Sequence, residues 1–98
     1  MSIVVRFRGA ANATKQVYDE TMPRIKASGE FPPDGLDYHV AFGPDDDLRV
    51  SEIWDSEIWD SREQFEEFGK RLMPILAEAG IELAGEPEIF DVHNIIRR

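Results

Sequence analysis

The chain has 98 residues, and its 20 Asp and Glu against 11 Lys and Arg give a formal net charge of −9. Because phosphate binding needs clustered basic side chains, this balance argues against DNA, RNA or an anionic membrane as the main partner. The absence of cysteine excludes disulfides, thiolate nucleophiles and cysteine-ligated metals. With no signal-peptide pattern and no apolar run approaching ~20 residues, the sequence predicts a single cytoplasmic domain over residues 1–98.

The first half of the chain predicts a strand and then a helix. Residues 3–8 are rich in β-branched side chains, which is typical of a strand. Apolar residues at helical spacing predict a helix over residues 12–28, with Asn12 as its N-cap. Pro23 lies inside this range, so we expect a kink or an early end of the helix there.

The second half predicts two strands, a helix and a last strand. A strand over residues 36–42 precedes a turn rich in Gly, Pro and Asp, after which a third strand begins at Leu48. A capping box of the S-x-x-Q type starts at Ser61 and predicts a second helix that runs to Gly80. The final predicted strand covers residues 88–96.

The predicted order β-α-β-β-α-β indicates a ferredoxin-like α+β fold, with both helices on one face of an antiparallel sheet. The other face would carry Trp, Phe, Val and Tyr side chains that a monomer leaves exposed. An apolar surface of this kind normally contacts a partner. The sequence therefore predicts a homodimer.

A tandem repeat interrupts the third strand: Ser-Glu-Ile-Trp-Asp occurs at residues 51–55 and again at 56–60. The perfect copy indicates a recent duplication, natural or engineered. Because strand side chains alternate between faces, an insertion of five residues exchanges the faces of a strand. Only one copy can therefore keep the original register.

Three placements of the repeat are open. A strand lengthened by ~17 Å would exceed what its neighbours can pair. Extra residues in the preceding turn would move Leu48 and Val50 out of the sheet. Alternatively, the second copy forms a loop or an extra helical turn, in which Ile58 extends the apolar stripe of the second helix. We expect this last placement, with the first copy in the strand, although the capping box at Ser61 argues against a full helical extension.

The strand-to-helix segment Ile-Trp-Asp-Ser, followed by residues 62–65 (Arg-Glu-Gln-Phe), resembles the W-[DE]-S-x-x-x-F junction of the antibiotic biosynthesis monooxygenase-like family. Residues 31–40 and 90–94 resemble a bacterial branch of that family. The resemblance implies a dimeric α+β barrel, in which two sheet faces close around an interior. Members include cofactor-free monooxygenases, lactone isomerases, haem-degrading enzymes and proteins with no known activity.

Haem-degrading members of the family use an Asn on the first strand, a Trp on the third strand and a His on the second helix. This chain has the tryptophan, but it has arginines on its first strand and no histidine in its second helix. The resemblance therefore implies no haem, and we expect no cofactor.

Four polar residues are candidates for catalysis: His39, His93, Arg6 and Glu52. Either histidine can act as a general base near neutral pH. Arg6 can bind a planar anion such as an enolate, and Glu52 can act as a base if the barrel excludes water. The structural alternatives are solvated or hydrogen-bonded histidines and an ion pair of Arg6 with Glu52 or Asp37.

Trp54 and Trp59 are the candidate ligand-binding residues, because an indole ring can stack on an aromatic ligand. Either ring could equally be part of the core or of the dimer contact. Tyr38 and Phe42 are expected in the core. No metal site is predicted, since the acidic run at residues 45–47 lacks the spacing and the bidentate glutamate of a calcium loop.

Two classes of function remain. The first is a cofactor-independent monooxygenase or isomerase that acts on a small aromatic or polyketide-like compound. The second is a non-catalytic dimer, either binding a small hydrophobic ligand or purely structural, possibly an insertion variant of its parent protein. An enzyme requires at least two of the polar candidates to converge inside a cavity, whereas a binding protein requires only the cavity.

Overall fold

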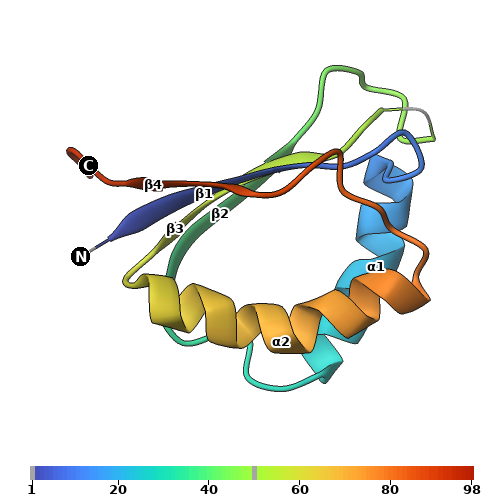
Figure 1. Cartoon of the computed structure of the whole chain (residues 1–98). Helices are drawn as coiled ribbons and strands as arrows, with labels where there is room; N and C mark the ends of the chain where they lie inside the picture. The colour runs from blue at the N-terminus through green and yellow to red at the C-terminus, as the bar shows by residue number, and fades with distance from the viewer. Residues whose placement is uncertain (1, 50) are drawn as a thin grey trace.

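The computed structural model describes residues 2–49 and 51–98. The chain forms an α+β fold in which both helices lie on one side of an antiparallel sheet (Figure 1). The sheet order is β2-β3-β1-β4, which confirms the predicted ferredoxin-like arrangement. The elements are β1 (Ile3–Arg8), α1 (Lys15–Ala27), β2 (Leu36–Phe42), β3 (Trp54–Trp59), α2 (Arg62–Glu78) and β4 (Glu88–Asp91).

Helix α1 begins later than the sequence predicts. Its N-cap is Thr14, whose hydroxyl accepts a hydrogen bond from the Val17 backbone N–H at 3.2 Å. The predicted N-cap, Asn12, instead donates from its side-chain amide to the Gly80 carbonyl just beyond the end of α2, at 2.6 Å. Helix α1 continues past Pro23 to Ala27, so the expectation of an early end is wrong.

In the C-terminal half, the start of α2 agrees with the prediction, but the end of β4 does not. Ser61 caps α2 as predicted, accepting from the Gln64 backbone N–H at 3.2 Å. Strand β4, however, ends at Asp91 rather than at residue 96. Asp91 pairs with Ile3, the first residue of β1, so a longer β4 would run beyond its only neighbour in the sheet.

The core lies between the sheet and the helices. Ile3, Val5 and Trp59 are buried there, and Phe65 and Phe68 of α2 pack on the Trp59 ring with centroids 5.7 Å away. Burial of such side chains is the main stabilising contribution in a domain of this size. This helix-facing side of the sheet is the apolar layer that the periodicity predicts.

The other side of the sheet, here called the open face, is uncovered in the single chain. Its apolar side chains include Tyr38, Val40, Phe42 and Phe90, which are 47%, 54%, 41% and 51% exposed. The expectation that Tyr38 and Phe42 belong to the core is therefore wrong for the single chain. Both side chains point away from the helices because they alternate with helix-facing residues of β2.

The second copy of the repeat, not the first, holds the register at the end of β3. Trp59 is fully buried and pairs with Ile3, and only Asp60 separates it from the Ser61 cap. The expectation that the second copy becomes a loop or helical turn is therefore wrong. The buried indole and the cap together fix where the strand ends and the helix begins.

The extra residues enter the connection between β2 and β3. Leu48, the predicted start of the third strand, lies in a turn and is 50% exposed. Val50, the other residue expected to leave the sheet, lies outside the described residues. Trp54, from the first copy, is the first residue of β3, so both copies contribute to the strand. Because the copies are five residues apart, the two tryptophans face opposite sides of the sheet.

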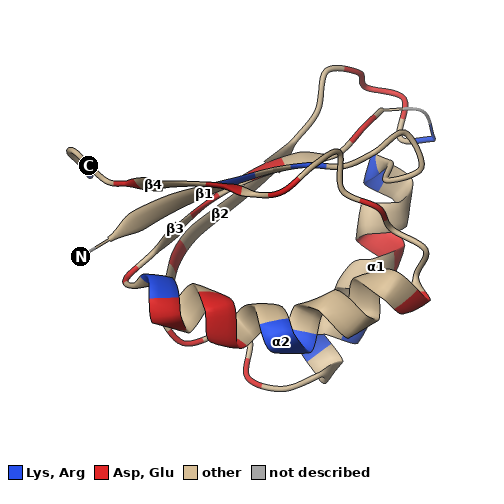
Figure 2. Cartoon of the chain, in the orientation of Figure 1, with Lys and Arg blue, Asp and Glu red and all other residues tan. Residues whose placement is uncertain are grey.

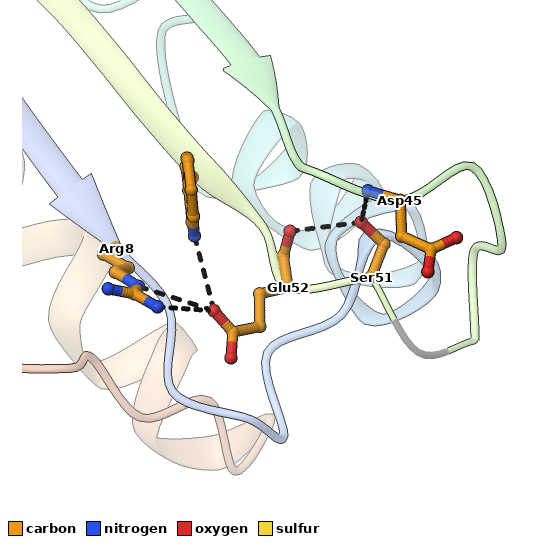
Figure 3. Close-up of polar contacts among 5 residues, drawn as sticks. Arg8, Asp45, Ser51 and Glu52 are labelled. Carbon is orange, nitrogen blue, oxygen red and sulfur yellow. Dashed lines mark hydrogen bonds and ion pairs between the residues drawn. The ribbon is translucent and has the colours of Figure 1, made fainter.

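Each copy also repeats one side-chain contact. The Trp59 indole donates to the Glu57 carboxylate at 3.1 Å on the helix side, and the Trp54 indole donates to Glu52 at 3.4 Å on the open face. Figure 3 shows the second contact, in which Arg8 also donates to Glu52 at 3.2 Å. The same figure shows the Ser51 hydroxyl accepting from the Asp45 backbone N–H at 3.3 Å, a bond that anchors the β2–β3 connection.

The acidic residues are spread along the helices, loops and strands, whereas Lys and Arg colour short, separated stretches of the ribbon (Figure 2). Across residues 2–49 and 51–98, no helix combines the length and the apolar character needed to cross a membrane.

Candidate active site

A cavity of about 100 Å³ lies between the sheet and the two helices. Most of its lining is apolar and comes from β1, α1, β2, the segment before β3, and α2; it includes Phe7, Ile25, Leu36, Ile53, Leu72 and Leu76. Four titratable side chains also line the cavity: Tyr18, His39, Asp55 and Glu57. An apolar hollow with a few convergent polar groups is the usual form of a small-molecule site.

The register of the sheet brings these polar groups together. His39 of β2 is directly opposite Glu57 of β3, so both side chains face the helices. Asp55 lies two residues before Glu57 on the same strand and therefore shares its face. Tyr18 reaches the group from α1, the helix that covers this part of the sheet.

A chain of hydrogen bonds links Tyr18, His39, Glu57 and Trp59. The Tyr18 hydroxyl lies 2.8 Å from His39 Nε2, and His39 Nδ1 lies 2.7 Å from Glu57 Oε2. Because a carboxylate oxygen accepts hydrogen bonds, Nδ1 carries a proton and donates a hydrogen bond to Glu57 Oε2. The second oxygen of Glu57 accepts from the Trp59 indole, so the carboxylate is held from two sides.

The surroundings of these hydrogen-bonded side chains shift their pKa values. The hydrogen bond to Glu57 raises the pKa of His39, against the opposing effect of burial, so the imidazolium form is favoured. Burial, together with the negative charges of Asp55 and Glu57, raises the pKa of Tyr18 to about 12. The phenol of Tyr18 therefore keeps its proton at neutral pH.

Asp55 differs from its neighbours because one of its oxygens has no partner. Within residues 2–49 and 51–98, Oδ1 of Asp55 is buried and makes no hydrogen bond. Burial, and secondarily the charge of Glu57, raises the pKa of Asp55 to about 7. A carboxyl group in this range exchanges its proton near neutral pH, as an effective general base or acid does.

One nitrogen of His39 and one oxygen each of Asp55 and Glu57 lie within 4.8 Å of one another, a spacing that could accommodate a metal ion. The sequence analysis predicted no metal site. Both ring nitrogens of His39 are already hydrogen-bonded, to Tyr18 and to Glu57. A metal ion bound by His39 would have to replace one of these two hydrogen bonds.

The four predicted catalytic residues do not converge. Only His39 lines this cavity. Arg6 lies on the open face, and Glu52 lies just before β3 on that same side. His93 is exposed in the segment that follows β4, outside the sheet in which it was predicted.

The predicted ion pairs of Arg6 are also replaced. Glu52 pairs with Arg8 at 3.2 Å, and Asp37 pairs with Arg97. Arg6 instead lines a second cavity of about 350 Å³ on the open face, together with Trp54.

The two predicted ligand-binding tryptophans take different places. Trp54 lies half-buried on the open face, where the Arg8 guanidinium is 5.2 Å from its ring centroid. Trp59 is a core residue and reaches the helix-side cavity only through its hydrogen bond to Glu57.

Sequence reasoning missed Tyr18, Asp55 and Glu57. Alternation counted backwards from Trp59 places Glu57 and Asp55 on the helix side, but that count requires the second copy to be in the strand. Tyr18 falls inside the helix predicted over residues 12–28, and nothing in the sequence distinguishes its hydroxyl as a functional group.

No family model matches the chain, and no curated protein matches it in sequence. Solved structures of similar fold are known. A variant of SnoaB, a cofactor-independent oxygenase from Streptomyces nogalater, aligns with a TM-score of 0.69 and 11% identity over 99% of this chain and 98% of the other.

A protein from Chloroflexus aurantiacus, proposed to be an antibiotic biosynthesis monooxygenase, aligns with a TM-score of 0.59 and 17% identity over 98% of this chain and 95% of the other. A heme-degrading protein from Mycobacterium tuberculosis aligns with a TM-score of 0.60 and 16% identity over 99% of this chain and 100% of the other. At these identities the likeness concerns the fold, and it agrees with the fold that the family resemblance implies.

Proposed function

We propose that this protein is a cofactor-independent monooxygenase that acts on a small aromatic compound bound in the helix-side cavity. The observation that carries the proposal is the hydrogen-bonded chain of Tyr18, His39 and Glu57 in the wall of an otherwise apolar cavity. The cofactor-independent oxygenase among the structures of similar fold supports it. An apolar site excludes water and strengthens the electrostatic interactions made inside it.

The polar chain is suited to stabilise an oxyanion. With His39 protonated, Nδ1–H donates to Glu57 and Nε2–H donates to the Tyr18 oxygen. The hydroxyl proton of Tyr18 is then free to donate to a developing phenolate or enolate in the cavity. Because this donor is positioned before the reaction, it stabilises the charge without reorganisation.

The proposed oxygenation needs no external reductant. A phenol that has lost its hydroxyl proton can transfer electrons to dioxygen directly, with one oxygen atom bonding to a ring carbon as a carbonyl oxygen and the other leaving as water. For a phenol, one molecule of substrate and one of dioxygen then yield one quinone and one water. The substrate supplies all four electrons, so no external electron donor is needed.

The test measures oxygen uptake by chelator-treated protein with a panel of small aromatic compounds and with no cofactor added. We expect uptake by the wild type and a fall in kcat of about 10²-fold in Tyr18→Phe, which removes the oxyanion donor. Tyr38→Phe is the matched control, because Tyr38 lies on the open face, and it should leave kcat unchanged. Quinone product is measured in parallel by absorbance.

The alternative, a non-catalytic ligand-binding protein, predicts a different outcome of the same experiment. Aromatic compounds would bind in the cavity with no oxygen uptake by any variant. A purely structural protein would show neither binding nor uptake.

We further propose a cytoplasmic homodimer that buries the open face. Tyr38, Val40 and Phe42 of β2 and Phe90 of β4 are exposed apolar side chains on the open face, and monomers rarely leave large apolar surfaces uncovered. Sedimentation at micromolar concentration should report a dimer. Val40→Glu should shift it to monomer, whereas a dimer that persists in this variant would contradict the proposed interface.

A further inference from the structure

We infer that the tandem repeat sets the ligand specificity of the cavity: it places the Asp55 carboxyl group in the cavity wall, where that group binds the hydroxyl of a single-ring phenol. The inference rests on the proposed function only in assuming that the helix-side cavity holds a small aromatic ligand.

The register of β3 connects the repeat to the cavity. With Trp59 fixed in the core, positions 55, 57 and 59 face the helices, and Ile53 lies in the cavity lining before them. Removal of either copy yields the same shorter sequence, in which Val50 directly precedes Ser56. The strand position now held by Asp55 would then belong to valine, and the position of Ile53 to Leu48.

The single-copy sequence therefore offers two aliphatic side chains where this chain has Ile53 and Asp55. The change from isoleucine to leucine is conservative. The change at the other position is not, because it replaces a carboxyl group by an aliphatic one. The repeat thus adds one carboxyl group to this wall.

Asp55 is the polar group of the wall that has a hydrogen-bond acceptor left for a ligand hydroxyl. Tyr18, His39 and Glu57 are bonded to one another, whereas Oδ1 of Asp55 is buried without a partner in the described part of the chain. A buried acceptor without a hydrogen bond destabilises the folded protein, because it has lost its bonds to water and gained none in return. A ligand hydroxyl that donates to Oδ1 would remove this deficit.

The chemistry of the wall defines the ligand. A carboxylate or phosphate ligand would meet the negative charges of Asp55 and Glu57, which excludes anions of this kind. The surrounding side chains are apolar, so the rest of the ligand is apolar as well. A cavity of about 100 Å³ suits roughly one ring, given that benzene occupies an engineered cavity of about 150 Å³. A neutral phenol meets all three conditions.

The test compares the binding of phenol and toluene, which have similar size but differ in the hydroxyl group. Dissociation constants are measured by calorimetry under nitrogen for the wild type, Asp55→Val, Asp55→Asn and the chain that lacks residues 51–55. Asp46→Asn, a change in the exposed turn, is the matched control. Working under nitrogen separates binding from any oxygenation.

We expect the ratio of toluene to phenol dissociation constants to fall roughly tenfold or more in Asp55→Val and in the single-copy chain, since a hydrogen bond to a charged group is lost. Asp55→Asn, which keeps the shape of the side chain, should lose part of the preference and serves if the valine variant does not fold. The control should keep the wild-type ratio.

An unchanged ratio in Asp55→Val, or no binding of either compound to the wild type, would overturn the inference. The two proposals fail separately. Oxygen uptake that persists while the ratio is unaffected by Asp55 contradicts only the role of Asp55. A ratio that falls as expected in a protein that consumes no oxygen contradicts only the oxygenase activity.

Discussion

Replacement of Asp55 by asparagine should make the protein more stable at high pH but not at low pH. Burial raises the pKa of Asp55 from 3.8 to about 7, so the folded state prefers the protonated carboxyl. Below pH 4 the group is protonated in both states and burial is not opposed. As the pH rises from 4 to 7, the unfolded chain ionises first, and stability falls until the folded carboxyl has also ionised.

The size of this effect follows from the shift. At about 1.4 kcal/mol per pKa unit, a rise from 3.8 to about 7 corresponds to at most about 4 kcal/mol of lost stability above pH 8. Asparagine has nearly the same shape and no charge. The difference in free energy of unfolding between Asp55→Asn and the wild type should therefore be near zero at pH 4 and reach several kcal/mol at pH 8.

The assay is urea unfolding at pH 4, 6 and 8, followed by tryptophan fluorescence, with Asp46→Asn as a control in the exposed turn. The raised pKa of His39 acts in the same direction as that of Asp55, since its stabilising contribution is also lost as the pH rises. Both proteins contain His39, whose pKa the charge of Asp55 helps to raise, so the difference between them reports Asp55 together with its coupling to His39. Parallel stability curves for the wild type and Asp55→Asn would refute the reasoning.

Three further predictions concern the repeat and its contacts. Trp59→Ala should lose about 3–5 kcal/mol in urea unfolding, whereas Trp54→Ala, on the open face, should lose much less; equal losses would contradict the assigned register. Glu57→Gln should lower stability by about 1–3 kcal/mol through its two hydrogen bonds, and an unchanged unfolding midpoint would count against them. Deletion of residues 51–55 should leave the far-UV circular dichroism spectrum essentially unchanged and raise the midpoint, because it removes connection residues and a buried carboxyl; an unfolded product would contradict the proposed register.

The element order could be predicted from the sequence because each element carries its own period and its own boundary signals. Strand β2 was predicted with its observed bounds, and α2 begins after the predicted Ser61 cap. The start of α1 was missed because Asn12 and Thr14 are both good N-cap residues. The choice depends on a tertiary contact, the bond from Asn12 to the end of α2, which local sequence does not reveal.

The site was predicted less well than the fold, for a related reason. His39 was identified because histidine is rare in this chain and chemically distinctive. Its partners could not be identified without the pairing of β2 with β3 and the packing of α1 on the sheet. Tyr18 and Glu57 meet His39 across 21 and 18 residues of sequence, and no local pattern encodes such contacts.

Burial of one tryptophan decides which of the two identical copies occupies the end of β3. The expected placement puts Ile58 on the apolar stripe of the second helix, but it also removes a large indole from the core. Full burial of Trp59 between two phenylalanine rings outweighs one extra aliphatic contact, so the copy next to the helix keeps the strand position.

That choice has a chemical consequence, because an insertion of odd length gives the two copies opposite faces. The same Glu-Ile-Trp segment supports the Tyr18–His39 chain on the helix side and pairs with Arg8 on the open face. Relative to the single-copy sequence, the repeat therefore alters two surfaces at once: it places Asp55 in the cavity wall and Trp54 on the face to which a second subunit is proposed to bind. If both proposals hold, deletion of residues 51–55 should alter ligand preference and dimer stability together, while Asp55→Val alters only the first.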